Sequence, residues 1–140
     1  MPILQGALLC DAAREYNGLV SVLGGFISIL RLRQIPVPAP VWFAGRVGFA
    51  ADELSRQHLI VVEAHFGSGR PPLAHAEIRL IPPETGAAEA PYPDLATGLN
   101  VILPMPFLIA QEGMYSVGLT VDDVSLVQLP LKVVTVAGEE

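Results

Sequence analysis

The sequence predicts an all-β protein, a two-sheet antiparallel sandwich of about seven to eight strands. Short runs of Val, Ile, Leu and Phe recur along the chain, and Gly, Pro and Asp separate them. No segment shows the longer periodic pattern of a helix. Because turns at this spacing are typical of immunoglobulin-like domains, we expect that topology in a single domain over residues 1–140.

Eight segments have the composition of strands. They are residues 3–10, 19–32, 41–50, 57–67, 73–82, 99–110, 114–121 and 124–136. The second segment is either one long strand or two, and the fourth and fifth form a predicted hairpin. "DAAREYNG", which follows the first, is either a helical turn or a polar loop that closes at Asn17-Gly18. Residues 83–96, rich in Pro, Ala and Glu, are predicted to be a long loop.

The glycine pair in "LVSVLGGF" predicts a bend inside the second segment. A phosphate-binding loop needs Lys and then Ser or Thr after its last glycine, whereas Gly25 is followed by Phe26. Paired glycines in a strand instead permit a sharp bend. We therefore expect the chain to pass from one sheet to the other at Gly24-Gly25.

Prolines stand at alternate positions in two places, Pro36-x-Pro38-x-Pro40 and Pro104-x-Pro106. In an extended chain, alternate N–H groups point to the same side. Each set of prolines therefore removes donors along one edge only, which is how an edge strand is protected from adding neighbours.

The closing segment predicts a final Greek-key hairpin with its turn at Asp122-Asp123. Tyr115 follows Gly113 at the start of this hairpin. In the tyrosine corner of immunoglobulin-like domains, the hydroxyl of such a residue binds nearby backbone. The alternative is that Tyr115 is a half-buried strand aromatic.

Five pieces of the chain, in order, resemble a family of small bacterial proteins known only as a domain of unknown function with a predicted β-sandwich. They are "ALLCDAA", "NGLVSVLGGF", "PVPAPVWFAGRVGF", "HLIVVEAHFGSGRP" and "EGMYSVGLTVDDVSLVQLPLKVV", within residues 7–134. The resemblance implies a fold but brings no activity, cofactor or catalytic residue. The chain departs from the family at the last turn, where members place Gly after Asp and this chain has Asp123.

Composition favours a protein that binds other proteins. The net charge is −6 and the eight basic residues are scattered, which excludes a nucleic-acid surface. Charged residues make up 16% of the chain, against roughly 25% in ordinary domains, and hydrophobic residues 51%. So few charges leave apolar patches exposed, and such patches mark partners. We expect a non-catalytic protein-binding or self-assembly module, a homo-oligomer or the partner of another protein. Alternatively, Ala, Gly and Pro inflate the hydropathy of a mildly polar surface.

Membrane and export signals are weak. The two longest uncharged runs, residues 16–30 and 95–111, contain three glycines and two prolines respectively, so neither predicts a membrane span. The N-terminus has no basic leader, which favours a cytoplasmic protein. Cys10 is the only cysteine, in agreement with a reducing compartment.

Trp42 and Arg46 are the predicted interface residues. In residues 41–50, Phe43, Val47 and Phe49 alternate with them and so face the other side of the strand. Trp is favoured at interface hot spots. The alternative is that the faces are reversed and Trp42 belongs to the core.

A candidate metal site is formed by two imidazoles and two carboxylates on one face of the fourth and fifth segments. They belong to Glu63, His65, His75 and Glu77. Placing His65 opposite His75 also opposes Glu63 and Glu77, which is unfavourable without a metal ion. A register shifted by two residues pairs Glu63 with Arg79 and His65 with Glu77, and needs no metal. We expect the paired surface; a metal-binding protein or metal-dependent enzyme is the alternative function.

No framework for catalysis is evident. Cys10 lies in an apolar run typical of buried cysteines, and no serine lies in a nucleophile elbow. The acidic pairs Asp52-Glu53 and Asp122-Asp123 fall where turns are expected. We therefore expect no catalytic residue and no cofactor. A second alternative is a small apolar ligand held in a cavity between the sheets.

Overall fold

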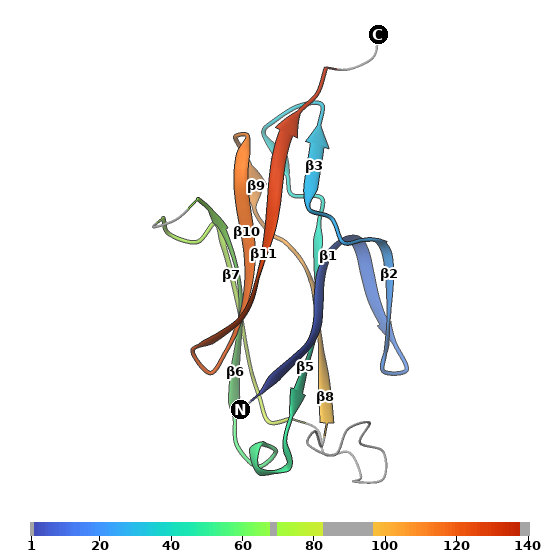
Figure 1. The fold of residues 1–140 in the computed structure, drawn as a ribbon, viewed down its shortest axis with the longest axis vertical. Coiled ribbons are helices and arrows are strands. Elements are labelled where there is room, and N and C mark those ends of the chain that lie inside the picture. Colours follow the sequence, from blue (N-terminus) through green and yellow to red (C-terminus); the bar gives the residue numbers. More distant parts are fainter. Residues whose placement is uncertain (1, 68–69, 83–96, 138–140) are drawn as a thin grey trace.

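The protein is all-β, as predicted. The computed structural model describes residues 2–67, 70–82 and 97–137, and this part contains eleven strands and one short 3₁₀ helix, η1 (Ala51–Glu53) (Figure 1). The strands are β1 (Ile3–Tyr16), β2 (Leu19–Gly25), β3 (Ile29–Leu32), β4 (Val37–Pro38), β5 (Trp42–Phe49), β6 (His58–Phe66), β7 (Ala74–Leu80), β8 (Thr97–Pro104), β9 (Leu108–Ile109), β10 (Gly113–Val121) and β11 (Val124–Thr135). Within these residues, no helix is long and apolar enough to cross a membrane.

The strands form two large sheets and one small one. Sheet A has the order β2–β1–β5–β8, sheet B has the order β3–β11–β10–β6–β7, and β4 pairs with β9. Neighbouring strands are antiparallel, except that β3 runs parallel to β11.

One hydrophobic core joins the two large sheets. Strand alternation points Phe43, Val47 and Phe49 of β5 inward, and all three are fully buried. Val117 and Leu119 of β10 belong to the same buried cluster from the side of sheet B. This core confirms the predicted division of β5 into an inner and an outer face.

The chain passes from sheet A to sheet B at the predicted glycine bend. β2 ends at Gly25, and β3 begins in the other sheet four residues later. Gly24 and Phe26 take φ values of 60° and 61°, a left-handed conformation, where the chain leaves sheet A. The Ile27 N–H donates to the Leu9 carbonyl at 2.9 Å and fixes the crossing.

"DAAREYNG" forms neither the helical turn nor the polar loop predicted for it, although the predicted closure at Asn17-Gly18 is confirmed. β1 continues to Tyr16 and pairs with β2 as a hairpin. Asn17 and Gly18, with φ values of 50° and 77°, form the two-residue turn that Asn-Gly favours. The segment is extended because β2 returns beside it and supplies its hydrogen-bond partners. The predicted strand over residues 99–110 is likewise divided into β8 and β9, whereas the loop predicted at 83–96 lies outside the described residues.

The alternating prolines lie on the segments that form the small β4–β9 sheet. Ala39, between Pro38 and Pro40, keeps its N–H and donates it to the Phe107 carbonyl at 2.9 Å. The Met105 N–H donates to the Val41 carbonyl at 3.0 Å. The residues left between the prolines therefore pair the two segments with each other.

The C-terminal hairpin has the predicted turn and the predicted tyrosine bond. Asp122 and Asp123 have φ values of 51° and 65°, which defines a two-residue turn of type I′. The Tyr115 hydroxyl donates to the Gln111 carbonyl at 2.7 Å, and the side chain is buried. The hydroxyl therefore ties the start of β10 to the corner before it.

Candidate functional site

Trp42 and Arg46 lie on the outer face of sheet A, as predicted, but this face is partly covered. The β1–β2 hairpin folds over it and forms a second buried cluster with β5. Cys10, Ala13 and Ala44 are the buried members of this cluster, and the half-buried Trp42 packs against them. Trp42 therefore packs against the inner side of the hairpin and is only partly exposed to solvent.

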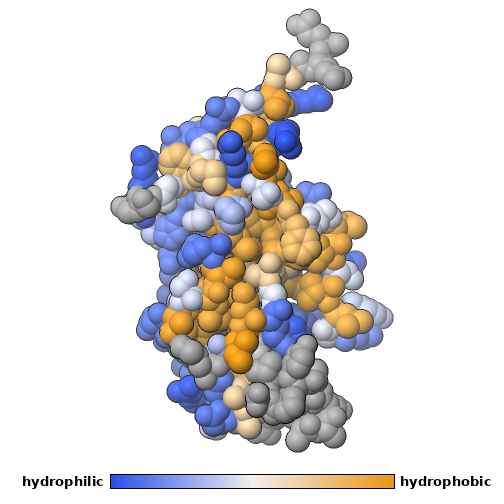
Figure 2. Space-filling view, viewed as in Figure 1, coloured by the Kyte–Doolittle hydropathy of each residue, from blue (hydrophilic) through white to orange (hydrophobic). Residues whose placement is uncertain are grey.

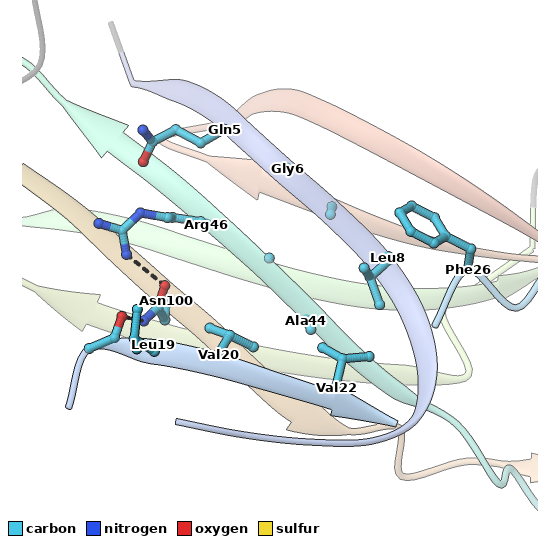
Figure 3. A pocket seen from close by; sticks show the side chains of 13 residues that line it. Gln5, Gly6, Leu8, Leu19, Val20, Val22, Phe26, Ala44, Arg46 and Asn100 are labelled. Atoms are coloured by element: carbon cyan, nitrogen blue, oxygen red, sulfur yellow. Dashed lines mark hydrogen bonds between the residues drawn. The ribbon is translucent and has the colours of Figure 1, made fainter. Parts of the chain in front are cut away.

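A hydrogen bond fastens the tip of the hairpin to the far side of the sheet. The side-chain amide of Asn100, on β8, donates to the Gly18 carbonyl at 3.1 Å. In Figure 3, β1 curves round and β2 returns opposite the outer face of the sheet. The hairpin and the sheet thus border a space that is open to solvent.

That space is a pocket of about 590 Å³, within the usual range for small-molecule sites. Its lining residues belong to β1, β2, β5 and β8, to the hairpin turn at Gly18 and to the bend at Phe26. The residues are Gln5, Gly6, Ala7, Leu8, Gly18, Leu19, Val20, Val22, Phe26, Ala44, Gly45, Arg46 and Asn100. In Figure 3, Gln5, Arg46 and Asn100 lie at one end, with Leu19 beside Asn100, and the other end is apolar. The predicted cavity between the sheets differs in place, because this pocket lies outside sheet A.

Arg46 provides the positive charge of the pocket. Its Nη1 donates to Asn100 Oδ1 at 2.8 Å. Gly98 makes room for the guanidinium, since a Cβ at this position would lie 2.5 Å from an Arg46 nitrogen. Among the ion pairs of the described residues, none joins Arg46 to a carboxylate. Among the described residues, the contact made by this cation is the hydrogen bond to the neutral amide of Asn100.

Gln5 is placed in the pocket by a β-bulge. Leu4 pairs with Val47 and Gly6 pairs with Arg46, so Gln5 is the extra residue of β1. Its Oε1 is buried and has no hydrogen-bond partner among the described residues. A buried acceptor of this kind is costly unless a donor reaches it.

The hairpin and the bend after it expose large apolar side chains, of which Leu19 and Phe26 also line the pocket. Tyr16, Leu19, Leu23 and Phe26 are 68%, 72%, 72% and 80% exposed. Figure 2 shows hydrophobic residues gathered on the right-hand side of the molecule, where the hairpin lies. This is the apolar patch that the low charge content predicted, although the sequence did not show where it would lie.

The predicted β6–β7 hairpin is present, but its register matches neither of those considered. Glu63 lies opposite His75, and Val61 lies opposite Glu77. The His75 ring bonds Glu63 through Nδ1 at 3.0 Å and Glu77 through Nε2 at 2.9 Å. These two hydrogen bonds raise the pKa of His75, and its bond lowers the pKa of Glu77. In this register, the imidazole of His75 has two carboxylate partners, Glu63 and Glu77.

His65 is separated from this group. It pairs with Ser116 of β10, beyond the end of the β6–β7 ladder. Three of the four residues of the predicted metal cluster, Glu63, His75 and Glu77, are joined by hydrogen bonds that use both ring nitrogens of His75. In the part of the chain that the structure describes, no three His, Cys, Asp or Glu residues are grouped as metal ligands.

A buried polar cluster at one end of the core was not predicted. His58 bonds Asp122 Oδ2 through Nδ1 at 2.5 Å and the Glu53 carbonyl through Nε2 at 2.7 Å. Asp122 Oδ1 also accepts the Leu59 N–H at 2.9 Å. Burial alone raises the pKa of Asp122, but the hydrogen bonds with His58 and Leu59 outweigh it and hold the pKa below its usual value. The cluster links η1, β6 and the β10–β11 turn.

Cys10 is buried beneath the hairpin. Burial, and then the neighbouring carboxylate of Asp11, raise the pKa of its thiol. The reactive thiolate is therefore disfavoured, in line with the expectation that this cysteine acts as a small hydrophobe.

Sequence comparison places the chain in a family. A family model described as a family of unknown function (DUF6941) matches residues 5–134, a range that includes the hairpin, the pocket and the Tyr115 corner. No curated protein matches the sequence. The matched range agrees with the resemblance found from the motifs, and the chain belongs to this family of unknown function, DUF6941.

Proposed function

We propose that the protein is a non-catalytic binding module that assembles with a second copy of itself through the free edge of β2, and that its fold is an immunoglobulin-like sandwich. The observation that carries the assembly is the exposed, uncharged β2 strand at the edge of sheet A.

Strand order supports the immunoglobulin-like topology. An immunoglobulin-like domain has its first, second and fifth strands in one sheet, and these correspond to β1, β5 and β8 of sheet A. Its third, sixth and seventh strands correspond to β6, β10 and β11 of sheet B. The hydrogen bond from Tyr115 to Gln111 has the form of the tyrosine corner. The β1–β2 hairpin is then an addition to that plan.

The edges of the sheets differ in their protection against strand addition. In sheet B, β3 carries Arg31 and β7 carries Glu77 and Arg79, and charged side chains disfavour edge-to-edge pairing. In sheet A, β8 ends at Pro104, whereas β2 contains neither a charged residue nor a proline. The unprotected edge therefore coincides with the exposed apolar hairpin.

A second copy is the partner that this edge fits best. Two β2 strands that pair around a twofold axis place the same residues near one another. A charged residue near the centre of the strand would then oppose its own copy, and β2 has none. Pairing would also bury part of Leu19 and Leu23, each 72% exposed in the single chain.

The positions of the reactive groups support a non-catalytic role. Both ring nitrogens of the buried His58 are occupied by hydrogen bonds, and the buried Cys10 thiol has a raised pKa. Neither residue is presented to a substrate.

Sedimentation velocity over a wide range of concentrations tests the assembly. We expect the wild type to be a dimer at high concentration and Leu23→Lys to raise the dimer dissociation constant at least about tenfold. Leu108→Lys, at a 54% exposed leucine on β9, is the matched control and should leave the dimer unchanged. A wild type that remains monomeric at every concentration, or a control that dissociates equally, would refute the proposal.

A further inference from the structure

The pocket beneath the β1–β2 hairpin has a cationic end and an apolar end, and the self-assembly proposed above uses neither. We propose that this pocket binds an amphipathic carboxylate of the fatty-acid type. The head group lies at Arg46, and the apolar chain lies between β2 and the outer face of sheet A.

Arg46 determines the charge of the head group. A guanidinium carries five N–H donors, and its hydrogen bond to Asn100, the one that Arg46 makes among the described residues, uses Nη1 alone. The remaining donors match the two oxygens of a planar carboxylate, the geometry in which arginine binds such groups most strongly. Asn100 holds the guanidinium from one side, and the space above Gly98 keeps it in position.

Gln5 predicts that the ligand carries a hydrogen-bond donor next to its head group. Its buried Oε1 accepts no hydrogen bond within the described residues and therefore calls for a donor. Oε1 is closed to solvent as placed, so a rotation of the side-chain amide toward the pocket would let it accept a hydroxyl or amide N–H next to the carboxylate of the ligand. We therefore expect an N-acyl glycine to bind more tightly than a plain fatty acid with the same chain.

The rest of the pocket fits an alkyl chain. Leu8, Val20, Val22 and Ala44 line its walls, and Phe26 lies at the apolar end with 80% of its surface exposed (Figure 3). A chain placed here would cover part of these side chains. Each methylene that reaches the walls should tighten binding by about fourfold.

Titration of the full chain with dodecanoate, below its micelle concentration, tests the proposal. Trp42 is the single tryptophan and packs in the same cluster as Leu8 and Val22, so its fluorescence reports on this pocket. We expect one dodecanoate per chain by calorimetry, with a matching fluorescence change. Dodecanol and dodecyltrimethylammonium should bind at least about tenfold more weakly.

Two variants separate the head from the tail. Arg46→Gln should weaken dodecanoate binding at least about tenfold and leave dodecanol binding unchanged. Arg79→Gln removes the same charge from the exposed edge of sheet B and should change neither. Gly6→Leu should abolish binding of both, because a Cβ at Gly6 meets nothing within 4 Å and its side chain would fill the pocket.

Three results would overturn the proposal. They are no saturable binding of dodecanoate, equal affinities for the acid, the alcohol and the cation, or unchanged dodecanoate binding by Arg46→Gln. Thermal unfolding of each variant shows that it is folded. If Gly6→Leu does not fold, the comparison of Arg46→Gln with Arg79→Gln still decides the question, since neither substitution alters a core residue.

Discussion

The turn between β10 and β11 allows a direct measurement of what the pair formed by the buried His58 and the partly exposed Asp122 contributes to stability. Asp122 and Asp123 are neighbours with nearly the same backbone conformation, at φ values of 51° and 65°. Asp122→Gly and Asp123→Gly therefore change the backbone alike. They differ in that Asp122 bonds His58 and Leu59 with its side chain.

The structure gives the size of the expected difference. Asp122 accepts hydrogen bonds at 2.5 Å and 2.9 Å, and a bond to a charged group contributes about 1.5–3 kcal/mol. Because the Asp122 side chain is 35% exposed, the low end of the sum applies, about 3 kcal/mol. Replacing Asp by Gly relieves about 1–2 kcal/mol of left-handed backbone strain at either position. The greater conformational freedom of glycine in the unfolded chain cancels about 0.4–1 kcal/mol of that gain. We expect Asp122→Gly to destabilise by about 1.5–3 kcal/mol and Asp123→Gly to be neutral or stabilising by up to about 1.5 kcal/mol.

Equilibrium unfolding in urea, followed by circular dichroism, measures both free energies. Equal stabilities of the two variants would refute this account of the cluster. If Asp122→Gly does not fold, Asp122→Asn provides the test. It keeps an acceptor for the Leu59 N–H and should lose only the part due to His58.

The same pair predicts a pH dependence with a defined sign. The pKa of Asp122 is lower in the folded than in the unfolded chain. Its contribution is therefore fully present above the unfolded value, about 3.9, and is lost as the pH falls toward the folded value. The difference between the wild type and Asp122→Gly should shrink below about pH 4. A constant difference down to that pH and below would contradict the prediction.

Three further predictions concern other parts of the fold. Tyr115→Phe should cost about 1 kcal/mol in urea unfolding because it removes a buried hydrogen bond, whereas Tyr16→Phe, at a 68% exposed site, should cost nothing measurable. The NMR titration midpoint of His75 should lie above the usual value and fall in Glu77→Gln. The stability that protonated His75 provides should be lost as the pH rises through that midpoint. An unchanged midpoint in Glu77→Gln would refute the contact. Cys10 should react with a thiol reagent only after unfolding, so rapid labelling of the native chain would show that the hairpin does not cover it.

Side-chain alternation was sufficient to predict the inner and outer faces of the strands. Phe43 and Val47 are core residues and Trp42 is not, because neighbouring residues of a strand point to opposite sides of the sheet. The second half of β1 was not predicted, since "DAAREY" becomes a strand only through its pairing with β2. Asn17-Gly18 was the available indication, as Asn-Gly is the strongest short hairpin pattern.

Turn length explains which registers could be predicted. The two-residue turn at Asp122-Asp123 fixes the pairing of β10 with β11 near the turn. The longer connection between β6 and β7 sets no register, so the contacts of His75 with Glu63 and Glu77 could not be deduced from spacing.

The polar end of the pocket could not have been deduced from any local pattern. Gln5, Arg46 and Asn100 come from three different strands and meet only because β1, β5 and β8 are neighbours in sheet A. Gln5 also depends on a bulge, which shifts the pairing between Leu4 and Gly6 and has no residue signature of its own. Arg46 alone was selected in advance, and on the basis of its face.

The two proposed sites share one element, the β1–β2 hairpin. The outer edge of β2 would meet a second copy, while Val20 and Val22 line the pocket beneath. If a ligand in the pocket steadies the hairpin, it strengthens the dimer by the same factor by which the dimer strengthens ligand binding, because linkage is reciprocal. Measuring the dodecanoate affinity of Leu23→Lys separates the cases. An affinity equal to that of the dimeric wild type shows independent sites, and a weaker one shows that the hairpin couples them.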